Sequence, residues 1–247
     1  MFNIFFCKDG LKKLRPDVYG LDDVTEDLKL YKYIDLSALV DIIDGNYLVR
    51  LRKFFSDRHE QGELSNPFIE HMLPVGYKVT GDDIKRWDDL KQKRLLSGDI
   101  PTSCFTLESE EMYHFWKSYT QNYTGIRIST TLGKLLDALD FSGFELYVGK
   151  MRYSKMDIPA YDMTKYLFCK KLWYQPENEF RIYFIPKGLS KIEDGIKIKI
   201  NVKCISEIVL SPFIPRSLKG KMFTILKSDT ALLDCKVNHS AIKEKSY

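Results

Sequence analysis

Apolar and polar positions follow a helical period in parts of the chain and a strand period in others. The clearest helical pattern places four residues at i, i+3, i+4 and i+7, between candidate caps Asp35 or Ser37 and Gly45: Leu36, Leu39, Val40 and Ile43. Similar spacing predicts helices at 82–96, 108–123, 132–139 and 161–171. Alternating or short apolar runs predict strands at 30–34, 47–51, 102–107, 126–129, 145–153, 180–185, 196–201, 205–210, 222–226 and 232–236.

This order of elements predicts an α+β fold. Helices and strands alternate early, and the second half is rich in strands, which favours two packed sheets. The sequence has no repeat and no linker-like stretch, so we expect an N-terminal extension at 1–28 and a single domain at 29–247. Of the 247 residues, 44% are hydrophobic and 13% are aromatic, a composition that excludes a disordered protein. A chain of this length is also long enough to bury a large core.

Charge, cysteine usage and hydropathy indicate a cytoplasmic protein. The net charge is only +4, although residues 187–247 carry twelve basic and six acidic residues, which predicts a mildly basic face or simply a solvated surface. Five widely spaced cysteines without a CxxC pair are typical of reduced thiols. No apolar run reaches the ~18–20 residues that cross a bilayer, and the N-terminus lacks the features of a secretory signal, so we expect no membrane partner.

Several common sites are disfavoured by the motifs that the sequence lacks. Its four histidines show no HExxH and no ligand spacing, so we expect no metal. GxGxxG and GxxxxGK are also missing, which disfavours Rossmann and P-loop nucleotide sites. Cys104 lies in a strand-like segment, where a cysteine usually packs rather than reacts.

The most informative segment follows Pro176. From Glu177 the pattern alternates, with Glu177, Glu179, Arg181 and Tyr183 on one face and Phe180, Ile182 and Phe184 on the other. Both carboxylates would then project from one face of a strand, ~6.5–7 Å apart along the backbone. One interpretation is an edge strand with a solvated Arg–Glu pair. The other is a paired-carboxylate site, in which one carboxylate stabilises a sugar cation and the other orients or deprotonates the attacking group, as in glycosyl transfer.

Four segments in order resemble the ADP-ribosyltransferase superfamily. They are a Tyr-x-Tyr strand at 31–33, a Phe-x-Asp-x-x-Glu-x-Gly loop at 55–62, a Ser-Cys-Phe-Thr strand at 103–106 with Trp-x-x-Tyr at 116–119, and Trp-Tyr-x-x-Glu-x-Glu-x-Arg at 173–181. Alone, each of the first three is typical of a core element or a polar loop. Together they resemble an uncharacterised bacterial branch, distantly similar to the DNA-targeting toxins of toxin–antitoxin systems.

The resemblance implies a split fold of two small, mostly antiparallel sheets flanked by helices that clasp NAD. It implies that Lys32 stands where a histidine is common in the family and binds the adenine-side ribose, flanked by Tyr31 and Tyr33. The strand residues Ser103, Phe105 and Thr106 are expected to shape the nicotinamide pocket, and Trp116 and Tyr119 either wall it or pack beneath it.

The resemblance assigns catalysis to the two glutamates. Glu179 would hold the nicotinamide-ribose hydroxyl, and Glu177 occupies the place that often sets the choice of acceptor. Arg181 is expected to keep a carboxylate ionised through its opposite charge. A carboxylate beside the sugar stabilises the positive charge that develops when the nicotinamide–ribose bond breaks.

The resulting hypothesis is an NAD-dependent ADP-ribosyltransferase that acts as a bacterial toxin or anti-phage defence effector. NAD is its co-substrate, nucleic acid is favoured over protein as acceptor, and an antitoxin or regulatory protein is the expected partner. The alternatives are a catalytically inactive nucleotide- or partner-binding module, a simple NAD glycohydrolase and a metal-dependent nuclease using Asp57, Glu177 and Glu179. The last has the least support, because no acidic-plus-lysine signature lies nearby.

Overall fold

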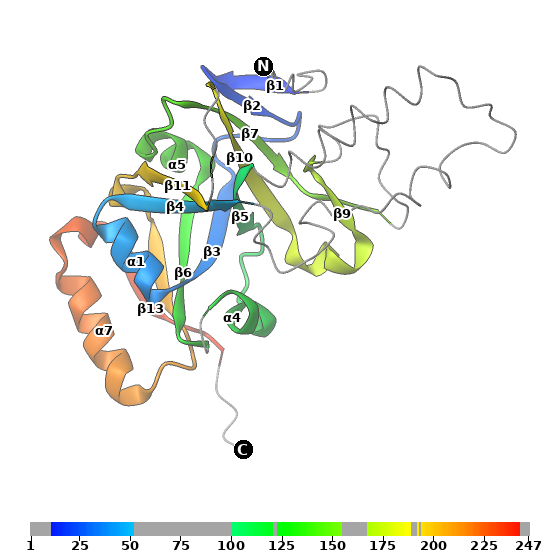
Figure 1. Cartoon of the computed structure of the whole chain (residues 1–247). Helices are drawn as coiled ribbons and strands as arrows, with labels where there is room; N and C mark the ends of the chain where they lie inside the picture. The colour runs from blue at the N-terminus through cyan, green and yellow to red at the C-terminus, as the bar shows by residue number, and fades with distance from the viewer. Residues whose placement is uncertain are drawn as a thin grey trace, which may run out of the picture.

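An eleven-stranded sheet is the frame of the part of the chain that the structure describes (Figure 1). The structure is a computed structural model, and it describes residues 11–51, 100–120, 123–154, 167–188, 192 and 194–242. The strand order is β1 (Lys12–Arg15), β2 (Val18–Gly20), β7 (Phe144–Lys150), β10 (Glu179–Pro186), β5 (Pro101–Thr106), β3 (Lys29–Asp35), β6 (Gly125–Thr131), β12 (Glu207–Leu210) and β13 (Lys236–His239). The α+β class predicted from the sequence is therefore confirmed.

The sheet divides at β5. On one edge β5 pairs with β10, and its other edge is shared between two strands. β3 pairs with β5 at Tyr31–Thr106, whereas β4 (Asn46–Leu51) pairs with its opposite end and continues into β11 (Gly195–Lys199). The two expected sheets are thus hydrogen-bonded into one branched sheet, because β5 belongs to both. A separate parallel pair is formed by β8 (Arg152–Ser154) and β9 (Cys169–Lys171).

Four α-helices and three 3₁₀ helices complete the described elements: α1 (Leu36–Ile43), α4 (Tyr113–Tyr119), α5 (Leu132–Ala138), α7 (Arg216–Ser228), η3 (Leu172–Glu177), η4 (Val202–Cys204) and η5 (Thr230–Leu232). The caps predicted for α1 are confirmed. The Asp35 carboxylate accepts a hydrogen bond of 2.8 Å from the Ala38 amide, and Gly45 follows the helix with φ of +75°.

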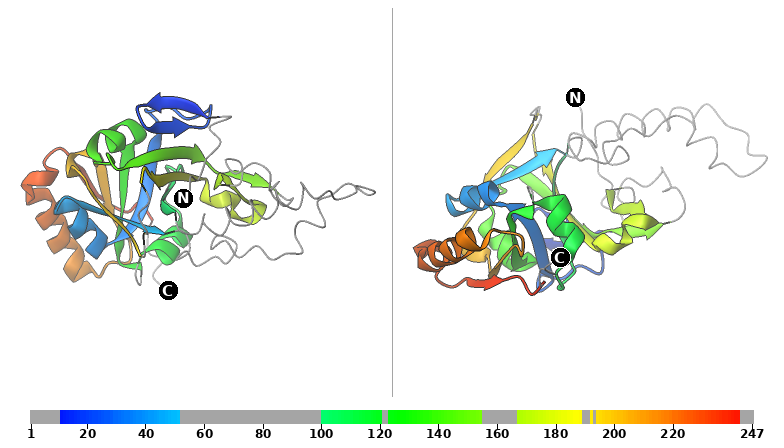
Figure 2. Two further views of the ribbon diagram at one scale, coloured as in Figure 1. Left: turned by 45° about the horizontal axis from the view of Figure 1, so that its top comes forward. Right: turned by 90° about the horizontal axis from the view of Figure 1, so that it is seen from below.

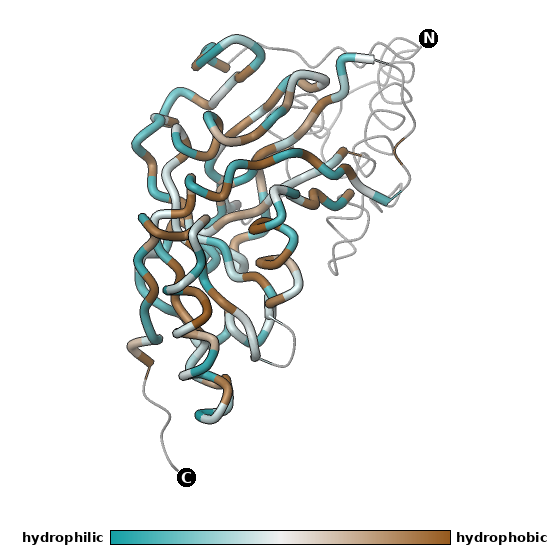
Figure 3. The backbone as a smooth tube through the Cα atoms, turned by 90° about the vertical axis from the view of Figure 1, so that its left-hand side faces the viewer, coloured by the Kyte–Doolittle hydropathy of each residue, from teal (hydrophilic) through white to brown (hydrophobic). Residues whose placement is uncertain are grey.

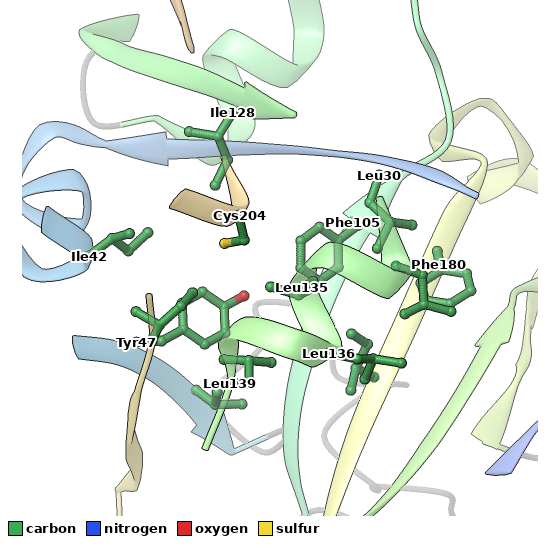
Figure 4. Close-up of a cluster of buried hydrophobic side chains, with 14 of the residues drawn as sticks. Leu30, Ile42, Tyr47, Phe105, Ile128, Leu135, Leu136, Leu139, Phe180 and Cys204 are labelled. Carbon is green, nitrogen blue, oxygen red and sulfur yellow. The ribbon is translucent and has the colours of Figure 1, made fainter. Parts of the chain in front are cut away.

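A large part of the core lies between the sheet and helices α1 and α5 (Figure 4). Hydrophobic and hydrophilic residues interchange along the chain (Figure 3). Successive side chains of a strand project to opposite faces of the sheet. Apolar residues from β3, β5 and β10 meet the helices there, and the labelled members include Leu30, Phe105, Phe180, Leu135 and Leu136. Phe180 is fully buried, which fixes the orientation of β10 and turns Glu179 and Arg181 to the opposite face.

Three local predictions are wrong, each where tertiary contacts decide the structure. The segment 222–226 lies inside helix α7, whose Leu226 is buried and whose Phe223 ring stacks on His239, rather than in a strand. The segment 232–236 does not form one strand, because Leu232 is the last residue of η5 and Lys236 is the first residue of β13. Residues 169–171 form β9 and not the end of a helix, because they pair with β8.

Helix α4 is shorter than the predicted 108–123. It begins after Met112, whose backbone is extended with φ of −108° and ψ of 124°. The Met112 amide donates to the Tyr33 hydroxyl at 3.3 Å, so this amide is used by a neighbouring strand and not by a helical turn. The predicted helix at 82–96 and the loop at 55–62 lie outside the described residues.

The described part of the first 28 residues belongs to the same sheet. β1 and β2 form a hairpin at one end of it, and β2 pairs in parallel with β7 (Figures 1 and 2). Val18 and Val24 are fully buried in the main core. Among the described residues, every helix is too short or too polar to cross a membrane.

Replacing Gly125 with alanine is expected to destabilise the protein by about 1–3 kcal/mol, because the site has no room for a methyl group. A Cβ there would lie 2.6 Å from the Cβ of Thr120 and even closer to the Ile34 carbonyl oxygen. Urea unfolding measures the change. Gly143→Ala is the control, since no described atom lies within 4 Å of its Cβ, and we expect it to stay within about 0.5 kcal/mol. Equal stability of the two variants would contradict this packing argument.

Candidate functional site

A tight turn delivers Glu179 to the first position of β10. η3 ends at Glu177, and the residue after it, Asn178, adopts the left-handed conformation with φ of 40°. The Asn178 side-chain amide donates to the Glu108 carboxylate at 2.7 Å, and its carbonyl accepts from the Leu107 amide at 2.8 Å. The Thr106 hydroxyl donates to the Glu177 carbonyl at 2.7 Å. The end of β5 therefore fixes the turn that carries both glutamates.

Glu179 forms a buried, two-point ion pair with Arg181. The Nε of Arg181 lies 2.6 Å from one carboxylate oxygen and its second nitrogen lies 2.9 Å from the other. Glu179 is 5% exposed and Arg181 is 1% exposed, so water screens this pair little. The bidentate geometry fixes the plane of the carboxylate and favours its ionised form.

Lys170 of β9 joins the two glutamates. Its Nζ lies 2.7 Å from Glu177 Oε2 and 3.2 Å from Glu179 Oε2. The same ammonium stands 4.3 Å from the centroid of the Tyr174 ring, a cation–π distance. We call these four charged residues the charge cluster: Lys170, Glu177, Glu179 and Arg181. With both carboxylates ionised, the charge cluster is neutral overall.

Two tyrosines lie beside the charge cluster. The Tyr153 hydroxyl accepts a 2.7 Å hydrogen bond from the Glu179 amide, and burial raises the pKa of Tyr153 to about 12. Desolvation, followed by the negative charges of Glu177 and Glu179, raises the pKa of Tyr119 above its ordinary value, although this residue is 48% exposed. Both phenols are therefore protonated and uncharged at neutral pH.

Three side chains align across adjacent strands on the face that carries Glu179. Glu179 pairs with Thr106 of β5, and Thr106 pairs with Tyr31 of β3. Directly paired residues of antiparallel strands project to the same side of a sheet. The structure thus brings together the expected site residues Tyr31, Thr106 and Glu179.

Lys32 belongs to the opposite face. Its Nζ donates to the Cys104 carbonyl at 2.7 Å, lies 3.4 Å from the Ser103 hydroxyl and stands 4.9 Å from the centroid of the Phe105 ring. The buried Ser103 hydroxyl is also hydrogen-bonded to the Tyr47 hydroxyl. Because side chains alternate along a strand, Ser103 and Phe105 project away from Thr106 and Glu179. The structure therefore separates Lys32, Ser103 and Phe105 from the charge cluster.

Tyr33 and Trp116 pack against each other rather than line an opening. Trp116 is completely buried, and its ring meets the Tyr33 ring edge-on with centroids 4.7 Å apart. Next to them, the guanidinium of Arg127 is buried, lies 5.1 Å from the centroid of the Tyr31 ring and donates to the Ser109 carbonyl at 2.8 Å. Of the Trp-x-x-Tyr pair, Tyr119 is the member whose charged neighbours include the glutamates.

η3 contributes an exposed aromatic surface close to Glu177. A hollow in the surface is lined there by Leu172, Trp173, Gln175 and Pro176. Trp173 is 64% exposed, and the Lys171 ammonium stands 5.1 Å from the centroid of its ring. The hollow is thus lined by residues of the same 3₁₀ helix that ends at Glu177.

Lys170, Tyr153 and Tyr174 were not identified from the sequence. Lys170 stands in the same segment as the glutamates, but their spacing does not show that a lysine seven residues earlier contacts Glu177. Tyr153 reaches Glu179 through the pairing of β8 with β9, which no local pattern indicates. Within the described ranges, no group of three histidine, cysteine, aspartate or glutamate residues could hold a metal ion.

The arrangement is suited to stabilising positive charge on a ligand. An oriented, ionised carboxylate at a strand terminus acts more strongly on a developing cation than one in open water, because it is already fixed and desolvated. Glu177 is more exposed than Glu179, with side-chain exposures of 20% and 6%, so it faces the outer part of the site. No family model, curated protein or solved structure matches this chain.

Proposed function

We propose that this protein is an NAD-dependent ADP-ribosyltransferase that transfers ADP-ribose to a macromolecular acceptor. The observation that carries the proposal is the buried Glu179 carboxylate, which Arg181 and Lys170 orient at the start of β10. Tyr31 and Thr106 in the same cross-strand row and the order of the four sequence segments support it. In this proposal the sheet that divides at β5 is a variant of the family's split fold, and the protein acts as a toxin or defence effector restrained by a partner protein.

Glu179 stabilises the ribosyl cation in the proposed reaction. Departure of nicotinamide leaves positive charge on the sugar, and one preorganised electrostatic group is typically worth about 3–4 kcal/mol in the transition state. Glu177, on the more exposed side, orients the hydroxyl, amine or ring nitrogen of the acceptor or takes up the proton that this group loses. The hollow beside Trp173 supplies an aromatic surface for a planar ring.

Incubation with radiolabelled NAD tests the proposal. Separate pools of DNA, RNA and lysate protein are added, and both label transfer and free nicotinamide are measured. We expect one pool to be labelled by the wild-type protein and not by Glu179→Gln. The proposal is wrong if no pool is labelled and no nicotinamide is released under any condition.

Nucleic acid is the proposed acceptor, and its labelling is expected to fall steeply between about 50 and 200 mM salt because phosphate contacts release counterions. Helix α7 supports this choice, since Arg216, Lys219, Lys221 and Lys227 occur there without an acidic residue. Labelling that does not depend on ionic strength would favour a protein acceptor. Release of nicotinamide without a labelled polymer would identify an NAD glycohydrolase.

A second candidate function is a nucleotide- or partner-binding module without catalysis. The observation that favours it is the charge balance of the cluster, because both carboxylates already have cationic partners. Calorimetry with NAD separates the two candidates. A binding module gives heat of binding without release of nicotinamide, whereas the transferase gives both.

A further inference from the structure

We propose that Lys170 is a positioning residue that holds the Glu177 and Glu179 carboxylates close together and keeps Glu179 charged at the proposed site. The inference rests on the proposed function for its kinetic consequence, but the contact on which it is built is independent of any activity. A single ammonium lies 2.7 Å from Glu177 and 3.2 Å from Glu179, in contact with one oxygen of each side chain.

The small β8–β9 sheet places Lys170 at this position. Lys170 pairs in register with Tyr153 across the parallel strands, so the two side chains project to the same side. Both then meet Glu179: the Tyr153 hydroxyl accepts from its amide at 2.7 Å, and the Lys170 ammonium donates to its carboxylate at 3.2 Å. The pair of strands thus presents one neutral and one cationic group to the first residue of β10.

Lys170 is buried enough for its positive charge to act on the two carboxylates with little screening by water. Its side chain is 10% exposed, compared with 20% for Glu177 and 6% for Glu179. An exposed lysine–carboxylate pair contributes little, because water screens the charges. At low exposure an ammonium within 4 Å favours the ionised form of a carboxylate strongly.

The charged and titratable groups around Glu179 come from six elements. Arg181 lies on β10, Glu177 and Tyr174 on η3, Lys170 on β9, Tyr153 on β8, Tyr119 on α4 and Cys104 on β5. The guanidinium of Arg181 already forms two bonds to Glu179, whereas among the described residues Lys170 is the cation that pairs with Glu177. Loss of Lys170 would therefore remove the described cation that contacts both carboxylates.

The acidic limb is the low-pH side of the profile of NAD turnover against pH. Loss of the Lys170 ammonium is expected to shift this limb upward by about 1–2 pH units. Turnover requires an ionised Glu179, so activity falls as pH falls through its titration. Removing a nearby positive charge, with Glu177 left close by, makes Glu179 take up its proton at higher pH. The shift is therefore upward for Lys170→Met, and Lys170→Arg is expected to keep the limb near its wild-type position.

Two further variants make the experiment specific. Lys171→Met removes an adjacent positive charge that lies over the Trp173 ring, and we expect its acidic limb to stay within about 0.3 pH units of wild type. Glu177→Gln in the Lys170→Met background removes the neighbouring negative charge and is expected to return the limb toward wild type. Equal displacement by both lysine substitutions, or no rescue by Glu177→Gln, would overturn the role of Lys170.

A carboxyl titration followed by NMR separates this inference from the proposed function. With ¹³C-labelled glutamate, the Glu179 carboxyl signal is expected to titrate at higher pH in Lys170→Met whether or not NAD is consumed. If wild type consumes no NAD but the signal moves, the proposed function is wrong and the electrostatic role stands. If wild type consumes NAD and neither the signal nor the acidic limb moves, Lys170 has no positioning role.

A purely structural role would give a different result. Lys170→Met would then lower activity equally at every pH and lower the thermal midpoint, and Lys170→Arg would not restore the limb. Circular dichroism of each variant establishes folding before turnover is compared. If Lys170→Met fails to fold, two other variants still test the claim. Lys170→Arg must leave the acidic limb at its wild-type pH, and the single Glu177→Gln must move the limb to lower pH.

Discussion

Glu179→Gln is expected to lower NAD turnover by about 10²–10³-fold, which corresponds to about 2.7–4 kcal/mol of transition-state stabilisation. Glutamine has nearly the same shape and keeps an oxygen that can accept from Arg181. What it loses is the negative charge that balances Arg181 and Lys170 and that would face the ribosyl cation. Release of nicotinamide at saturating and at limiting NAD measures the effect on kcat and on kcat/KM.

Glu145→Gln is the matched control for this substitution. Glu145 is on β7, where it accepts from the Tyr147 hydroxyl at 3.3 Å, and it has no place in the proposed chemistry. We expect its turnover to stay within about a factor of two of wild type. Wild-type turnover by Glu179→Gln, in a protein that remains folded, would mean that Glu179 is not the catalytic carboxylate.

Arg181→Met is expected to destabilise the folded protein by about 3–5 kcal/mol, because it removes one of the two cations that contact the buried Glu179 among the described residues. Arg181 is 1% exposed and its guanidinium makes two bonds to the carboxylate, so water cannot replace them without opening the sheet. Urea unfolding monitored by tryptophan fluorescence gives the change in the free energy of unfolding.

A double-mutant cycle separates the ion pair from simple packing. Glu179→Leu combined with Arg181→Met removes both charges and is expected to cost less than the sum of the single substitutions. The control pair is Arg15–Glu26, which is also at hydrogen-bond distance but has side chains 26% and 41% exposed. Arg15→Met is expected to cost about 1 kcal/mol or less. Additive effects at residues 179 and 181 would show that the pair is not coupled.

Local sequence patterns were sufficient to predict the helices and strands that are determined by residues close together in the chain. α1 follows from the Asp35 cap, its apolar face and the glycine after it, all of which the structure contains. The alternation along β10 correctly separates the core residue Phe180 from Glu179 and Arg181. The failures have the opposite cause: the short apolar run at 222–226 has no period that distinguishes helix from strand, and packing of α7 on β13 decides it.

The same distinction holds for the candidate site. Strand alternation correctly places Glu179 and Arg181 on one face of β10, and the ion pair between them is found. It is wrong for Glu177, which lies at the end of η3 and not on the strand, because Asn178 adopts the left-handed conformation between the two glutamates. Lys32 could not be located in this way, because its face relative to Glu179 depends on how β3 is registered against β5. Lys170 was missed for a related reason, since its position depends on the pairing of β9 with β8 across segments that are distant in sequence.

The division of the sheet gives Lys32 a role that needs no ligand. Between Thr106, where β3 pairs, and Thr102, where β4 pairs, one edge of β5 lacks a described partner strand. The Lys32 ammonium reaches the Cys104 carbonyl in that interval, where a peptide N–H of a continuous ladder would otherwise stand. A side chain thus donates to the backbone of β5 in the interval between the two branches, and a methionine at residue 32 would remove this hydrogen bond from the fork.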